Sequence, residues 1–198
     1  MSAMPGFEHF VVHPRFGRGP RISGLNVEPT GAPDVFLHWH SPADVRVPNT
    51  AIKARVGLQK PSTLPVTHYF DSRRVCRSCK RPFLFFAEEQ QHWYEELKFP
   101  LEADCVKCVD CRKEEHLLRA ARDRYEALLS NPDRSVEETL LLAESCLQLV
   151  EASVFTEKAL PRIRALLKPL AAGHQGSGRE AAAQLLERAR TVRHSDDA

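Results

Sequence analysis

The feature that most constrains this chain is a pair of Cys-x2-Cys motifs, the first at Cys76 and Cys79 and the second around Cys108. Each motif holds two sulfurs at the spacing that a tetrahedral ion accepts, and the intervening loop is long enough to bring the pairs together. Free core cysteines or disulfides are the alternative explanation. Five cysteines within residues 76–111 argue against that alternative, so the sequence predicts one four-thiolate Zn²⁺ site.

Length and composition indicate an ordinary protein of one or two small domains, with 198 residues, 42% apolar and 27% charged. The first residues have neither the basic start nor the apolar centre of a secretory signal. We therefore expect a cytoplasmic protein without membrane contact, whose thiols stay reduced, which again favours zinc over disulfides. The net charge of +2 gives no global attraction to nucleic acid.

Residues 1–70 lack helical periodicity and consist of short strand-like runs between Pro- and Gly-rich turns. We expect strands at 10–13, 21–27, 35–40 and 45–47. Four short strands suit a small SH3-like β-barrel. The predicted class is α+β, with this barrel over 1–70, a zinc ribbon over 71–115 and helices over 116–198.

The run His13-Pro-Arg-Phe-Gly-Arg-Gly19 resembles the opening of the Tudor-like (SH3-like) module that ends some superfamily 1 DNA-repair helicases. In that family the module is a docking piece associated with RNA polymerase, which implies a binding role here. Arg15, Arg18 and Arg21 project from this turn and could meet phosphates or an acidic protein face. The alternative is a solvated turn whose arginines contact nothing.

His38 and His40 flank Trp39, so on a strand the two histidines share one face and the tryptophan points the other way. No third metal ligand is spaced to join the histidines. We therefore expect a buried Trp39 with two exposed histidines.

The stretch after Cys79 alternates as a strand does at Phe83 and Phe85 and turns helical from Ala87. This stretch resembles a family of bacterial zinc-ribbon domains whose function is loosely known. The matching residues are Cys76, Cys79, Phe83, Phe85, Glu89, Gln90, Trp93, Tyr94, Phe99 and the ending Cys111-Arg-Lys113. The resemblance implies a zinc ribbon and carries no assured activity.

Three cysteines compete for the last two ligand positions. Cys108 and Cys111 place two cations directly after the motif, as in the ending of that family, whereas Cys105 and Cys108 match its usual loop length. Val109 suits the position after a metal-binding turn less well than a cation does. We therefore favour the ligand set Cys76, Cys79, Cys108 and Cys111.

Cations surround both motifs, including Arg74 and Arg77. They form either a nucleic-acid patch or a local offset for the −2 charge that four thiolates leave on one Zn²⁺. Trp93 could stack on a nucleic-acid base, but packing against the small metal core is the commoner role for such a side chain.

The last third of the chain is helical by its apolar spacing. One helix is expected to run to about residue 131, and Ser135-Val-Glu-Glu138 is a capping box that opens the next helix, to about residue 154. A short helix between Pro161 and Pro169, a flexible linker at 173–178 and a terminal helix follow. These helix pairs are similar to tetratricopeptide-type hairpins.

The sequence contains no phosphate-binding glycine loop and no nucleophile elbow, and four cysteines would close the zinc shell, so we do not expect an enzyme. The first hypothesis is a zinc-binding protein that interacts with nucleic acid or with a polymerase or helicase of the transcription and repair machinery. The second is a protein–protein adaptor that uses its C-terminal helices, with purely structural zinc.

Overall fold

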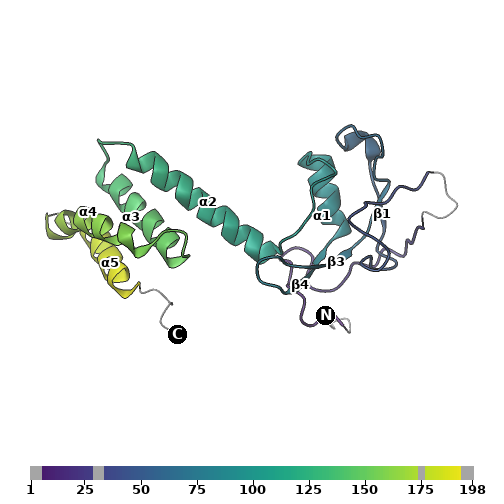
Figure 1. The fold of residues 1–198 in the computed structure, drawn as a ribbon, viewed down its shortest axis with the longest axis horizontal. Coiled ribbons are helices and arrows are strands. Elements are labelled where there is room, and N and C mark those ends of the chain that lie inside the picture. The colour runs from purple at the N-terminus through teal and green to yellow at the C-terminus, as the bar shows by residue number, and fades with distance from the viewer. Residues whose placement is uncertain (1–5, 29–33, 174–176, 193–198) are drawn as a thin grey trace. The chain divides into compact units, whose positions relative to one another are not determined.

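The computed structural model describes residues 6–28, 34–173 and 177–192, and the chain divides into two compact units, Met1–Arg112 and Lys113–Ala198. The predicted barrel and the predicted ribbon as far as residue 112 fall within the first unit. Its elements are β1 (Ile52–Lys53), the 3-10 turn η1 (Val56–Leu58), β2 (His68–Tyr69), β3 (Ser72–Val75), β4 (Pro82–Phe85), α1 (Ala87–Gln91) and the π-helical turn η2 (His92–Glu96) (Figure 1). Helix α2 (Val109–Leu129) begins in the first unit, and α3 (Val136–Glu151), the 3-10 turn η3 (Glu157–Ala159), α4 (Leu160–Gly173) and α5 (Ser177–Thr191) follow in the second.

The expected closed barrel does not form in the part of the chain that the structure describes. Two separate antiparallel sheets of two strands are found instead, β1 with β2 and β3 with β4. The β3–β4 hairpin has the register Ser72↔Phe85 to Val75↔Pro82. Most of the predicted early strands are reduced to isolated bridges, such as Arg46↔Ser72.

The physical reason is that the early segments pair with residues outside the predicted strands. The segments 21–27 and 35–40 bond to residues 49–51 and 67, and the other two bond to the cysteine-containing part. Val11 N donates to the Pro82 carbonyl at 2.8 Å, and Val47 N donates to the Asp71 carbonyl at 2.8 Å. Their apolar side chains pack against the same hairpin. Val11 packs with Cys76, Phe83 and Phe85, and Val47 packs with Leu84 and Phe86. The N-terminal segment is therefore a cover on the hairpin, and the two predicted domains share their cores.

Asp71 joins three parts of the first unit through its buried carboxylate. Oδ2 accepts from Arg21 N at 2.7 Å, and Oδ1 accepts from Ala87 N, the first residue of α1, at 2.7 Å. No side chain at Phe86 caps this helix, so the distant aspartate supplies the missing acceptor. Burial raises the pKa of Asp71 to about 6, although the two N–H donors oppose that shift.

The helical unit confirms the predicted capping box. Ser135 Oγ accepts from Glu138 N at 3.1 Å, while Ser135 N donates to Glu138 Oε2 at 2.8 Å. One cluster of α3, α4 and α5 residues, centred on Cys146, Leu147 and Leu167, forms the core. Cys146 is a buried free thiol within this apolar cluster.

The prediction that the third helix stops before Pro169 is wrong, because α4 continues through it to Gly173. Proline removes the hydrogen bond to the carbonyl of Ala165, but Ala165 is exposed, so water can satisfy that carbonyl. Of the predicted linker at 173–178, residues 174–176 lie outside the described part, and Ser177 already begins α5. Among the described helices, none is long and apolar enough to cross a membrane.

Candidate metal centre

The first cysteine pair lies in the turn that joins β3 to β4. Cys76 N donates to the Arg81 carbonyl at 3.0 Å and Lys80 N donates to the Cys76 carbonyl at 3.0 Å, which closes a tight loop around the two sulfurs. Lys80 has a φ of 62°, a left-handed conformation that this reversal requires. The hairpin therefore presents Cys76 and Cys79 together at its tip.

The second pair lies at the start of a helix rather than in a second hairpin. Cys108 directly precedes α2 and Cys111 is in its first turn, and residues three apart share one face of a helix. A zinc ribbon would carry both pairs on β-turns, so this part of the prediction is corrected. One pair on a hairpin and one pair on a helix N-terminus is the arrangement of a treble clef.

The four sulfurs of Cys76, Cys79, Cys108 and Cys111 all lie within 4.8 Å of one another. The Cys79 and Cys108 sulfurs are 3.7 Å apart. Four ligands at the usual Zn–S distance of about 2.3 Å form a tetrahedron with edges of about 3.8 Å, so the donor set and its size fit Zn²⁺. Of the two candidate pairs, the structure brings Cys108 and Cys111 to the first motif.

Cys105 lies in the apolar core beside this group and is not part of it. Its side chain is 1% exposed, and its Sγ donates to the Lys107 carbonyl at 3.5 Å. Burial raises the pKa of the Cys105 thiol to about 12, as it does for Cys111, so the position of Cys105 outside the four-sulfur group is what separates it from the ligands.

The electrostatics of the four-sulfur group call for a cation. Burial raises the pKa of Cys111, and the neighbouring sulfurs of Cys108, Cys76 and Cys79 raise it further. Burial also disfavours the Cys76 thiolate, but N–H groups of Cys108, Cys79 and Ser78 donate to its sulfur and lower its pKa overall. Four thiolates so close together are stable only around a divalent ion.

Two of the cations near the motifs, Arg74 and Arg81, contact neighbouring side chains of the first unit. Arg81 Nη2 lies 3.0 Å from Asp110 Oδ2, and the pKa of Arg81 is raised because its guanidinium also donates to Cys79. Arg74 Nη2 lies 3.3 Å from Asp104 Oδ1. The contact of Arg81 with Cys79 favours the interpretation that cations offset the charge of the thiolates, whereas Arg74 is paired with a carboxylate.

A buried carboxylate, Glu89, links the metal centre to the N-terminal turn. Its Oε1 lies 2.6 Å from Arg112 Nη2, next to the ligand Cys111, and 3.7 Å from His13 Nε2. Burial would raise the pKa of Glu89, but His13 and Arg112 hold it below its usual value. In the sequence Glu89 is visible only as part of the zinc-ribbon pattern, and that pattern is the signal from which its role could be found.

The turn at His13 has a structural explanation that the sequence analysis missed. His13 Nδ1 accepts from Arg15 N at 3.2 Å and from Phe16 N at 3.3 Å, and the Phe16 ring stacks on the imidazole at 4.7 Å between centroids. Phe16 also contacts Phe86 at 5.0 Å. The His-Pro-Arg-Phe-Gly run is therefore a compact turn that docks on the hairpin.

The structure separates the predicted partner-binding residues into two groups. Arg15, Arg18 and Arg77 are exposed. Arg15 also lies over the Phe16 ring at 5.2 Å. Arg21 is exposed too, but its Nε pairs with Glu88 Oε1 at 2.7 Å. Arg74 pairs with Asp104, and the Trp93 ring contacts Phe85 at 4.9 Å, Phe99 at 5.2 Å and the Arg112 guanidinium at 5.1 Å.

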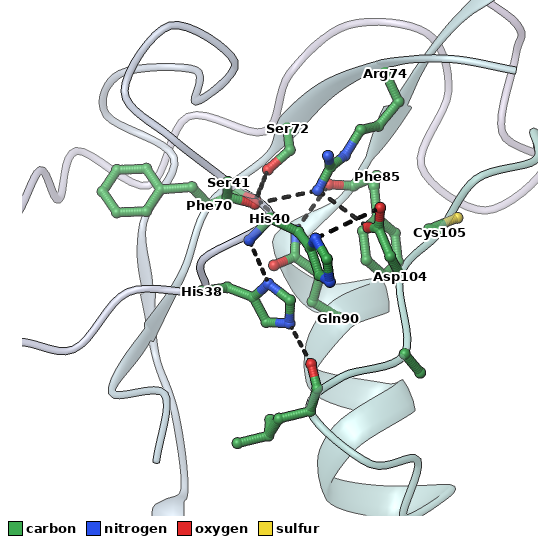
Figure 2. Close-up of polar contacts among 12 residues, drawn as sticks. His38, His40, Ser41, Phe70, Ser72, Arg74, Phe85, Gln90, Asp104 and Cys105 are labelled. Atoms are coloured by element: carbon green, nitrogen blue, oxygen red, sulfur yellow. Dashed lines mark hydrogen bonds and ion pairs between the residues drawn. The ribbon is translucent and has the colours of Figure 1, made fainter. Parts of the chain in front are cut away.

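The expectation for Trp39 is wrong, because Trp39 is 50% exposed and His38 is 5% exposed. His38 Nδ1 accepts from His40 N at 3.2 Å, and its Nε2 donates to the Leu101 carbonyl at 2.7 Å (Figure 2). The imidazole ring thus joins two main-chain groups, the N–H of His40 and the carbonyl of Leu101. The alternation of side chains along a strand cannot reveal these contacts. Burial lowers the pKa of His38 to about 4.

Figure 2 shows how a polar network continues from this histidine toward the hairpin. His40 Nδ1 lies 4.0 Å from Asp104 Oδ2, and Ser41 Oγ lies 2.9 Å from Ser72 Oγ. Gln90 Nε2 donates to the carbonyls of Phe70 at 2.6 Å and Phe85 at 3.0 Å. These bonds connect α1 to the segment that precedes β3 and to the end of β4. The Glu-Gln pair of the sequence pattern thus serves two connections, one through Glu89 and one through Gln90.

The comparison with protein families agrees with this geometry. Residues 70–119 match the family described as "Probable treble clef domain". No curated protein matches the chain. No solved structure matches it either.

Proposed function

We propose that the chain is a non-catalytic, zinc-stabilised binding protein in which Cys76, Cys79, Cys108 and Cys111 hold one Zn²⁺. The observation that carries this proposal is the compact set of four sulfurs. Four thiolates complete a tetrahedral shell and leave no coordination position for a substrate or a water molecule. The ion fixes the hairpin tip to the start of α2, and Arg112 and Glu89 extend that support to the N-terminal turn.

The proposed partner is nucleic acid or an acidic face of a polymerase or helicase of the transcription and repair machinery. Support comes from Arg15 and Arg18 on the docked turn and Arg77 on the metal-binding turn, all of them exposed. For Arg77 and Arg15, no ion pair is found among the residues that the structure describes. Exposed guanidinium groups on a rigid scaffold suit phosphate or carboxylate contacts.

The test is a charge reversal of Arg15, Arg18 and Arg77 to glutamate, with binding to labelled single-stranded and duplex oligonucleotides and to purified RNA polymerase measured over a salt series. Each lost phosphate contact should reduce the slope of log affinity against log salt by about 0.7 to 0.9. Lys60→Glu is the matched control, because Lys60 is an exposed cation elsewhere in the first unit. Binding that is unchanged in the triple variant contradicts this partner assignment.

A groove in the helical unit supports the adaptor as the second candidate. This groove, of about 300 Å³, lies between α3 and α5, with Leu140, Leu141 and Leu185 on its walls. Leu141 is 40% exposed there. If the chain is an adaptor, Leu141→Asp should abolish capture of a protein partner. The variant with Arg15, Arg18 and Arg77 changed to glutamate should leave that capture intact.

A further inference from the structure

One edge of the β3–β4 hairpin is open over part of its length. Cys76 N points toward β4, since it donates to the Arg81 carbonyl, and Arg73 N points the other way, since it donates to the Val45 carbonyl at 2.8 Å. Because main-chain groups alternate along a strand, the Val75 N–H and the Arg73 carbonyl also point away from β4. No hydrogen bond to either group is found among the residues that the structure describes.

The segment that covers the start of this edge leaves it before Val75. Residues 45–47 pair with 71–73, but Val45 N then bonds to the Pro42 carbonyl at 3.1 Å in a turn. Val75 is 65% exposed. The edge is occupied again at Arg77, whose N–H donates to the Val106 carbonyl at 2.9 Å, so the stretch available to an incoming strand is the one between Arg73 and Arg77.

A cavity of about 550 Å³ lies along this stretch, with Val45, Arg73, Arg74, Val75, Arg77 and Val106 among its lining residues. The cavity contacts Arg73, Arg74 and Val75 in succession, and it extends across Val75 to Pro82 of β4 and to Phe10. Val45 and Val106, whose carbonyls accept from Arg73 N and Arg77 N, mark the part of the cavity that lies beside the unpaired main-chain groups.

The charge of the cavity defines what it would accept. Arg74 is paired with Asp104, whereas Arg73 and Arg77 have no ion pair within the described part of the chain. The buried Nε of Arg74 also has no hydrogen-bond partner there. Val45, Val75 and Val106, together with Phe10 and Pro82, supply the apolar part of the wall.

We propose that the β3 edge binds an extended acidic peptide segment of a partner protein by β-strand addition. The peptide would pair its main chain with Arg73 and Val75, place carboxylates against Arg73 and Arg77, and set alternate apolar side chains on Val45 and Val106. This proposal rests on the proposed binding role of the chain and shares Arg77 with it, but it uses Arg73 and the edge at Val75 in place of the turn that carries Arg15 and Arg18.

The test uses a fluorescent, end-capped decapeptide of alternating valine and glutamate, with fluorescence anisotropy as the readout. Two further peptides carry N-methyl groups on alternate residues, one on the even and one on the odd positions. We expect the unmodified peptide and one methylated peptide to bind, and the other methylated peptide to fail, since only one set of N–H groups faces β3. Equal binding of both methylated peptides, or no binding of the unmodified one, overturns the proposal.

Protein variants locate the binding surface. Val75→Pro removes the outward N–H without removing a hairpin bond and should weaken binding about tenfold or more. Arg73→Glu with Arg77→Glu should do the same, and Lys60→Glu should have no effect. Zinc content and circular dichroism verify that each variant is folded; should Val75→Pro fail that check, the methylated peptides decide.

A ten-nucleotide deoxythymidine oligomer separates this site from nucleic-acid binding. Oligomer binding that requires Arg73 and Arg77 but persists in Val75→Pro, without peptide binding, assigns the cavity to phosphates and overturns the strand-addition proposal. Peptide failure alone leaves the test of Arg15 and Arg18 unaffected.

Discussion

The first unit buries polar and charged side chains at its centre, whereas the helical unit buries an almost purely apolar core. Among described residues, the buried polar set of the first unit is His38, Ser41, Thr50, Gln59, Asp71, Ser72, Glu89, Gln90 and Glu95, while the helical unit contributes Ser145. The difference follows from secondary structure. Two-residue and four-residue strands bury few apolar side chains, so hydrogen bonds and a metal must connect the irregular segments.

Each unit should therefore respond to a different perturbation. Metal removal and a change of pH act on thiols, histidines and carboxylates, which belong to the core of the first unit. Loss of apolar volume acts on the helices α3, α4 and α5, whose buried contacts are mainly between aliphatic side chains.

Loss of a metal ligand should give the largest effect. Cys76→Ser leaves three sulfurs for an ion whose binding contributes on the order of 10–16 kcal/mol in small structural zinc sites. We expect the first unit to lose its tertiary structure, as seen by hydrogen exchange of β3 and β4, while the amides of α3 and α4 remain protected. Loss of protection in both units at once would contradict the contrast between them.

A cavity in the helical core should destabilise the helical unit and leave the first unit intact. Leu147 is fully buried in the cluster of α3, α4 and α5, and Leu147→Ala should cost about 2–5 kcal/mol of unfolding free energy in that unit. Zinc content and exchange protection of β3 and β4 should stay at their normal values. The matched control is Leu141→Ala at the more exposed position of the same helix, for which the cost should be small.

Protonation of His38 should make the first unit sensitive to acid. Its pKa is lowered from 6.5 to about 4, so the unfolded chain binds the proton first as the pH falls from about 6.5 to 4. The stabilisation is complete above pH 6.5, and about 3 kcal/mol is lost across that window. Asp71 has the opposite effect on stability as the pH falls, because its pKa is raised to about 6 in the folded chain. Asp71 is present in both proteins compared below, so its contribution cancels.

The measurement is the unfolding free energy of wild type and His38→Gln as a function of pH. Glutamine keeps a donor for the Leu101 carbonyl but does not titrate, so the advantage of the wild type should shrink as the pH falls from 6.5 to 4. A difference that stays constant over this range would show that His38 does not take up a proton on unfolding.

Local sequence rules found the parts of the fold that local chemistry determines. The spacing of Cys76 and Cys79 marks the hairpin tip, and the Ser135 capping box marks the start of α3. Contacts between distant segments were not predictable in the same way. Nothing near Val11 or Val47 in the sequence shows that their N–H groups bond to the Pro82 and Asp71 carbonyls. Without those partners, short strands predict a barrel.

The candidate site shows the same division. The Cys108–Cys111 spacing is visible in the sequence, but its position at the start of a helix, which distinguishes a treble clef from a ribbon, depends on the apolar pattern of α2 further along the chain. The role of Glu89 between Arg112 and His13 depends on residues far apart in the sequence. Burial of His38 in place of Trp39 likewise depends on a carbonyl of a distant loop, at Leu101.

The central claim is that one Zn²⁺ is held by Cys76, Cys79, Cys108 and Cys111, and that Cys105 is a core thiol. The most direct measurement is zinc per chain, by metal analysis of the purified full-length protein, in Cys105→Ser and Cys111→Ser side by side. We predict one zinc per chain in the wild type and in Cys105→Ser, and loss of the metal in Cys111→Ser. Zinc retained in Cys111→Ser and lost in Cys105→Ser would contradict the ligand set, and a wild type without zinc would contradict the site itself.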